Sequence, residues 1–130
     1  MCIRDSITTH YALSGHPDFR LGLGALGPAS EWPVPPIYAR LSDGIRKAAG
    51  LPDAALEIFT SHVTMDVTHA RIMMEAIAPY AEDEQGQRRV REGATRSLDA
   101  RSVMLDGLYR IVYREPVPMF EASPVRLNGV

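Results

Sequence analysis

The segment 51–80 most constrains what this chain can fold into, because its residues follow a helical repeat with two sides of different character. If the segment forms one helix, its inward positions recur at alternating steps of three and four residues. These positions are Phe59, His62, Asp66, His69, Met73, Ala76 and Tyr80, flanked by Leu56, Val63, Ala70 and Ile77. A stripe of this kind packs against other helices, so the segment predicts the central helix of an all-α bundle.

Three ionisable residues, His62, Asp66 and His69, stand in the middle of this inward stripe, where leucine or isoleucine is the usual occupant. Burial of an unpaired carboxylate is unfavourable, and a cation or a metal ion is the usual means of stabilising one. The triplet is therefore the main indication of function in this sequence.

The spacing of the triplet favours two metal ions over one. Residues four and seven positions apart share a helix face, but seven residues rise roughly 10 Å along the axis. The Asp66-x-x-His69 step resembles the Glu-x-x-His step by which di-iron bundles bind metal from one helix, and His62 can serve a second ion. Imidazole and carboxylate ligands without thiolate suit iron or manganese, and open coordination positions suit dioxygen activation at Fe(II).

A purely structural explanation of the triplet is also open. A single histidine on an apolar face is more often a satisfied core residue than a ligand. Asp66 can instead pair with Arg101, at the rim of the last helix's apolar side. In that case the polar groups form a buried network in a non-catalytic helical domain that serves packing or assembly.

Four helices are expected, in a bundle domain that covers residues 16–114. A short helix begins near residue 16 and carries small residues that allow close packing; Gly27-Pro28 then bends or breaks it. The other helices cover 37–49, ended by Gly50, then 51 to about 81, and 84–113. The last one has its apolar side at Val90, Ala94, Leu98, Met104, Leu105, Leu108, Ile111 and Val112. Residues 1–15 form an unassigned leader without a firm period, and 115–130 an extended tail.

Outside the triplet, the candidate site residues are weaker. Glu31, beside Trp32, is either a further carboxylate ligand or a first-turn residue that complements a helix dipole. His10 lies in loop-like sequence. Ser97 has no companion motif that would make it a nucleophile.

Composition excludes several classes of function. The 130-residue chain has room for one domain, its net charge is −2, and Lys47 is its single lysine, so nucleic-acid binding is not expected. No apolar run is long enough to span a bilayer and the first residues lack a signal peptide's apolar core, so we expect a soluble cytoplasmic protein. The single cysteine, Cys2, excludes an internal disulfide and a thiolate metal site.

From about residue 16 to 111, the chain resembles the C-terminal part of the haem-oxygenase-like di-iron proteins, also called iron-containing redox enzymes. The matching features are the triplet His62-x3-Asp66-x2-His69, Glu31 about thirty residues upstream beside a proline-rich helix start, and the closing run SLDARSVMLDGLYR. The resemblance implies that Glu31, His62, Asp66 and His69 are metal ligands. It also implies a di-iron centre that activates dioxygen to oxidise a small organic substrate.

One departure from the family pattern matters. Family members carry another glutamate and histidine, seven residues apart, on an earlier helix, and no Glu-x6-His precedes Glu31 here. We therefore expect a fragment of a longer protein that holds four of about six ligands, with incomplete metal loading and an exposed core face prone to homodimerisation. Among relatives of this fold, a thiaminase-type hydrolase needs a nucleophilic cysteine and a haem oxygenase needs one axial histidine. The metal-independent pyrroloquinoline-quinone biosynthesis oxidase is the enzymatic alternative.

Overall fold

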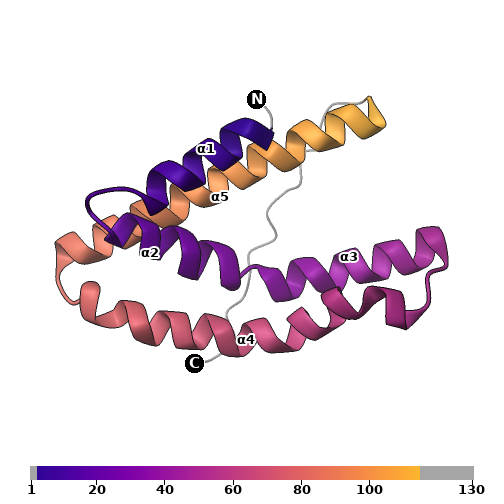
Figure 1. The fold of residues 1–130 in the computed structure, drawn as a ribbon, viewed down its shortest axis with the longest axis horizontal. Helices are drawn as coiled ribbons and strands as arrows, with labels where there is room; N and C mark the ends of the chain where they lie inside the picture. Colours follow the sequence, from indigo (N-terminus) through magenta and orange to yellow (C-terminus); the bar gives the residue numbers. More distant parts are fainter. Residues whose placement is uncertain (1–2, 115–130) are drawn as a thin grey trace.

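The computed structural model describes residues 3–114, which form helices joined by short turns and contain no strand (Figure 1). The α-helices are α1 (Ile3–Ser14), α2 (Arg20–Leu26), α3 (Val34–Ala49), α4 (Glu57–Ile77) and α5 (Glu84–Tyr113). Three short segments complete the chain: the π-helix η1 (Gly27–Glu31) and the 3-10 helices η2 (Asp53–Leu56) and η3 (Ala78–Tyr80). The expected all-α architecture is confirmed.

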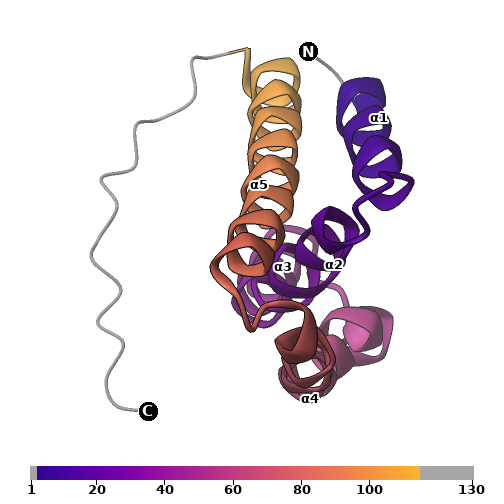
Figure 2. The same ribbon diagram turned by 90° about the vertical axis from the view of Figure 1, so that its left-hand side faces the viewer.

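The helices are arranged in two layers. In the upper layer of Figure 1, α1 lies along α5, and α2 packs against both of them. In the lower layer, α3 lies along α4 (Figure 1), and the end view of Figure 2 shows α4 on the opposite side of α2 from α1. The π-helix η1 contacts α2 and α5 of the first layer as well as α3 and α4 of the second. It is therefore the junction at which the layers meet.

Close backbone packing joins α2 to α5. A Cβ atom added to Gly24 would overlap the Val90 carbonyl oxygen, and one added to Gly93 would overlap the Leu21 carbonyl oxygen. The buried residues of α5 are mostly small and recur at steps of four and three: Gly86, Val90, Gly93, Ser97 and Ala100. The small residues expected to allow close packing of the first short helix do so.

The predicted apolar side of the last helix is wrong over most of its length. Val90 is buried, but Leu98, Leu105, Leu108, Ile111 and Val112 are exposed. The reason is geometric: α2 and α1 approach α5 along its stripe of small residues, where the backbones come closest, and the larger side chains lie beside that contact.

The sequence pattern predicts no helix within residues 1–15, whereas the structure places 3–14 in helix α1. This helix packs against α5 and α2, and its Leu13 side chain is fully buried. Leu13 forms a core cluster with Leu21 and Ala25 of α2. The packed part of the chain thus begins well before residue 16. The expected extended tail, 115–130, lies outside the described residues.

The helices of the second layer begin and end near the expected positions. Gly50 follows α3 with a positive φ of 61°, the left-handed conformation that ends a helix. The predicted central helix is divided into η2, α4 and η3, because Pro79 tightens its last turn and the first turn after Pro52 is a 3-10 turn. The Gly27-Pro28 break is confirmed as the π-helical segment η1.

None of the helices within residues 3–114 combines the length and apolar character that crossing a membrane requires.

Candidate metal centre

The structure brings three of the four predicted ligands together. One ligand atom each from Glu31, Asp66 and His69 lies within 4.8 Å of the other two. His69 Nδ1 is 3.0 Å from Asp66 Oδ1 and 3.7 Å from Glu31 Oε2. We call these three residues the carboxylate-histidine cluster.

The cluster forms where η1 crosses α4. Asp66 and His69 are three residues apart on α4, so both side chains leave the helix on the same face. Glu31 is the last residue of η1, whose wider π turn begins at Gly27-Pro28 and carries the carboxylate over to α4. The interpretation of Glu31 as a first-turn residue is wrong, since Glu31 ends η1 and two residues, Trp32 and Pro33, separate it from the start of α3.

Burial within the cluster is unequal. Asp66 is 2% exposed, as the inward stripe predicts, but the His69 side chain is 47% exposed and that of Glu31 is 32% exposed. Ala76 and Tyr80, also predicted to face inward, are exposed as well. The reason is that α4 packs against α3 and η1 but has no further helix over this side within residues 3–114. The cluster is therefore open to solvent at His69 and closed at Asp66.

The geometry and chemistry of the cluster fit a divalent metal ion. Two ligands about 2.1 Å from one ion lie about 3 Å apart when adjacent and about 4.2 Å apart when opposite. The two distances from His69 Nδ1 fall within this range. Two carboxylates and one imidazole form a hard, mainly oxygen donor set that suits iron or manganese. In the metal-free chain, the proton on His69 Nδ1 is donated to Asp66, and an ion would take its place between the same atoms.

His62 does not belong to the carboxylate-histidine cluster; it lies one turn earlier on α4. Its Nδ1 is 2.6 Å from the Ile58 carbonyl oxygen, which can only accept, so Nδ1 carries the proton and Nε2 keeps a free lone pair. The ring also packs against Tyr38 of α3, with ring centroids 5.7 Å apart. This is the tautomer that a metal-binding histidine held by a backbone carbonyl adopts. A ligand role for His62 at a second ion stays a prediction.

Arg101, the proposed partner of Asp66, makes a different contact. Its Nη2 donates to the Ser30 hydroxyl at 3.4 Å, next to Glu31 in η1. Asp66 is instead paired with His69. A buried Asp66–Arg101 ion pair therefore does not account for the carboxylate.

A pocket of about 660 Å³ lies beside the cluster and shares Asp66 with it. Its other lining residues come from the turn into α3 and from α4: Trp32, Pro35, Pro36, Val67, Ala70, Arg71 and Met74. The sequence pattern did not predict this pocket. The sequence nevertheless held a signal for it, because Trp32 directly follows Glu31, Val67 follows Asp66 and Ala70 follows His69.

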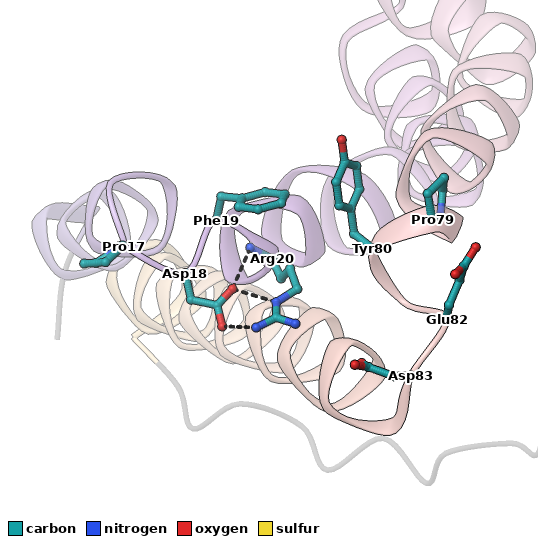
Figure 3. Close-up of a pocket in the computed structure, with 8 residues that line it drawn as sticks. All are labelled: Pro17, Asp18, Phe19, Arg20, Pro79, Tyr80, Glu82 and Asp83. Atoms are coloured by element: carbon teal, nitrogen blue, oxygen red, sulfur yellow. Dashed lines mark hydrogen bonds and ion pairs between the residues drawn. The ribbon is translucent and has the colours of Figure 1, made fainter.

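A second hollow, of about 770 Å³, lies where the start of α2 faces the turn between α4 and α5 (Figure 3). Asp18 and Arg20 are already engaged with each other: the Arg20 guanidinium contacts both oxygens of Asp18 and lowers the pKa of Asp18 to about 2. Phe19 and Tyr80 meet edge to face, with ring centroids 5.0 Å apart. The ring contact joins the start of α2 to the turn between α4 and α5, and the hollow shares no residue with the cluster.

A serine and a histidine that the sequence did not connect form a pair in the first layer. His10 Nδ1 lies 2.7 Å from the Ser6 carbonyl oxygen, so Nε2 accepts the proton of the Ser97 hydroxyl at 2.8 Å. The arrangement resembles a nucleophile with its base. Ser97 is fully buried, however, so a substrate does not reach its hydroxyl, and the pair instead links α1 to α5.

Comparisons with known proteins identify a matching family and a relative. The family described as iron-containing redox enzyme matches residues 2–102, a range that includes all of the cluster. A protein of Nitrosomonas europaea named 4-aminobenzoate synthase is 35% identical over 92 residues, which cover 70% of this chain and 37% of that protein. The chain thus corresponds to little more than a third of this relative. No solved structure matches the chain significantly.

Proposed function

Because this chain belongs to the family of iron-containing redox enzymes, we propose that it carries part of the metal centre of a non-haem iron oxidase. In the full-length protein this enzyme activates dioxygen to oxidise a small organic substrate. The proposal is carried by the convergence of Glu31, Asp66 and His69, with one ligand atom of each residue within 4.8 Å of the other two. The relative whose name states the synthesis of 4-aminobenzoate supports a small organic molecule as the reactant.

The residues of the chain have distinct roles in this proposal. Asp66 is the buried anchor, Glu31 carries a second carboxylate from another segment, and His69 supplies an imidazole on the solvent side. His62, with Nε2 free, serves a second ion together with ligands outside residues 3–114. Bound iron supplies the redox chemistry for dioxygen. Two ions per full-length protein are proposed, and manganese suits the same donors.

Two features of the protein around the metal site bear on catalysis. The carboxylate-histidine cluster is closed by Asp66, so an ion would enter from the His69 side. The 660 Å³ pocket places a small substrate next to Asp66 and keeps apolar side chains around it, which excludes water from the reacting atoms. Homodimerisation through exposed apolar residues stays a prediction, checked by the mass in solution.

Metal loading tests the proposal directly. The purified chain is loaded anaerobically with Fe(II), desalted, and its iron measured by mass spectrometry. We expect about one iron per chain, reduced at least tenfold in Asp66→Ala and in Glu31→Gln. Asp99→Ala is the matched control, because Asp99 is an exposed carboxylate of α5 outside the cluster.

Two outcomes would contradict the proposal. The first is iron loading in the Glu31→Gln and Asp66→Ala variants equal to the unaltered chain. The second is an iron content near zero in the unaltered chain and in the Asp99→Ala control alike. Because Glu31 is only partly buried, Glu31→Gln keeps the test decisive if Asp66→Ala does not fold, which circular dichroism reports. In the full-length protein, His62→Ala is expected to lose about one of two irons.

A further inference from the structure

The pocket beside the cluster has a lining that indicates the class of substrate. This inference rests on the proposed function, because it takes the pocket as the place where the substrate meets the metal centre. Two segments build both features: Trp32 directly follows Glu31, and Val67 and Ala70 each adjoin a cluster residue on α4. A molecule in this pocket therefore lies against Asp66, the buried wall of the cluster.

The walls of the pocket are apolar and partly flat. Trp32, Pro35 and Pro36 contribute rings to the lining, and the apolar residues of α4 contribute Val67, Ala70 and Met74. The indole of Trp32 is 63% exposed, which is unusual for the largest apolar side chain. Aromatic rings bind flat partners through offset or edge-to-face contacts. A volume of about 660 Å³ is in the range of pockets that bind small organic molecules.

The charges of the lining fix the direction of a ligand. Asp66 and Arg71 are the charged residues of the lining. They are five positions apart on α4, a rise of roughly 7.5 Å along the helix. Arg71 donates through Nη1 to Glu75 at 2.7 Å, and Glu75 is outside the lining, so the remaining donors of the guanidinium stay available. An anionic group would be repelled by Asp66 and attracted to Arg71.

We propose that this pocket binds planar aromatic carboxylates. The ring lies between Trp32 and α4, the carboxylate meets the Arg71 guanidinium at the mouth, and the opposite edge of the ring faces Asp66 and the cluster. This orientation presents a ring position, not the carboxylate, to the metal centre.

Binding to the metal-free chain tests the proposal separately from iron loading. Trp32 is the single tryptophan, so its indole Nε1–H gives one NMR cross-peak that reports on the pocket wall. The probes are benzoate, the uncharged isostere benzamide, and the non-planar cyclohexanecarboxylate. We expect benzoate to shift the cross-peak saturably. Benzamide should bind up to about fivefold more weakly, since an exposed ion pair contributes up to about that factor. Cyclohexanecarboxylate keeps the charge but should also bind more weakly, because a non-planar ring cannot stack on the indole.

Variants of Arg71 locate the carboxylate. Arg71→Gln is expected to weaken benzoate about fivefold and leave benzamide unchanged, while Arg71→Lys retains part of the difference. Glu75→Gln is the matched control: it removes the partner of Arg71 and is expected to bind benzoate at least as tightly as the unaltered chain. Arg71 is well exposed, so these changes do not disturb the fold.

The outcomes distinguish this proposal from the proposed function. Equal affinity for benzoate and benzamide, an Arg71→Gln variant with unaltered benzoate binding, or no saturable shift with any probe overturns the pocket assignment. Arg71→Gln is expected to load iron normally, and Glu31→Gln to bind benzoate normally. Loss of iron loading alone therefore refutes the metal centre, and loss of benzoate selectivity alone refutes the pocket.

Discussion

The two layers of the molecule differ in how they are packed. In the layer of α1, α2 and α5, buried leucine, alanine, valine, serine and glycine residues are spread over the three helices. In the layer of α3 and α4, the buried residues are Ser42, Asp66 and Ile77, whereas large apolar residues are exposed in both layers. The chemistry predicted from the sequence lies in this second, loosely packed layer.

This difference indicates that the first layer mainly stabilises the fold and the second mainly binds ligands. The first layer holds its helices so closely that even a methyl group has no room at two positions, and it contains no member of the cluster. The second layer carries the cluster and the pocket, where a buried carboxylate and an exposed indole are each unfavourable for stability alone. Substitutions should therefore affect stability in the first layer and ligand binding in the second.

The largest effect is expected at the contact between α2 and α5. In Gly93→Ala, the new Cβ would overlap the Leu21 carbonyl oxygen, so one helix must move away from the other. We expect the free energy of unfolding to fall by about 3 kcal/mol or more, or the chain not to fold. Urea denaturation followed by circular dichroism measures the change.

The matched control is a glycine in the second layer. Gly44 lies inside α3 and has nothing within 4 Å of an added Cβ. Gly44→Ala should therefore raise the free energy of unfolding by up to about 1 kcal/mol, because alanine favours the helix. If both substitutions had the same effect, the two layers would not differ in packing as described.

The next effect concerns the buried carboxylate of the second layer. Asp66→Leu removes a charge that is 2% exposed, so the metal-free variant should be as stable as the unaltered chain or up to about 2 kcal/mol more stable. Manganese at a hundred times its dissociation constant should stabilise the unaltered chain by about 2.7 kcal/mol and the variant not at all. Thermal denaturation with and without Mn²⁺ checks both. A metal-free variant that is less stable by several kcal/mol would make Asp66 a structural residue.

The sequence alone predicted the second layer better than the first. The helices over 37–49 and 51–81, the Gly27-Pro28 break and the burial of Asp66 follow from spacing and from breaker residues, and the structure confirms them. These features are local, because a residue three or four positions away is enough to define them.

What could not be predicted depends on contacts between distant segments. The stripe Gly86, Val90, Gly93, Ser97 and Ala100 has little hydrophobic contrast, so the periodicity pointed to the leucine side of α5. Helix α1 was missed for the same reason, since its packing rests on Leu13 and on the His10–Ser97 bond. The exposure of His69 and the pocket at Trp32 depend on which segments pack against α4. The spacing of residues within α4 does not predict those segments.

A smaller effect is expected at the link between α1 and α5. Ser97→Ala removes the buried hydroxyl that donates to His10 Nε2 and leaves this half-buried acceptor without that partner. The free energy of unfolding should fall by about 1 kcal/mol, the usual contribution of one hydrogen bond. Ser102→Ala, at an exposed position of the same helix, should change it by less than about 0.5 kcal/mol. Equal changes in the two variants would mean that the pair does not hold α1 in place.

The smallest effect should appear in the dependence of stability on pH, through the contact between Asp18 and Arg20 at the start of α2. The hydrogen bonds from Arg20 lower the pKa of Asp18 from its ordinary value of 3.8 to about 2 in the folded chain. Because the folded pKa is the lower one, the contribution of Asp18 is fully present above pH 3.8 and is lost as the pH falls towards 2. The pair is close to solvent, so salt weakens it.

Thermal denaturation between pH 2 and pH 5 measures this contribution. The melting temperature of the unaltered chain should fall more steeply below pH 3.8 than that of Asp18→Asn, and 0.5 M NaCl should reduce the difference. Arg20→Gln should produce the same flattening, and adding it to Asp18→Asn should change little further, because both remove one interaction. Parallel pH profiles for all variants would show that the Asp18–Arg20 contact drawn in Figure 3 adds nothing to the stability of the chain.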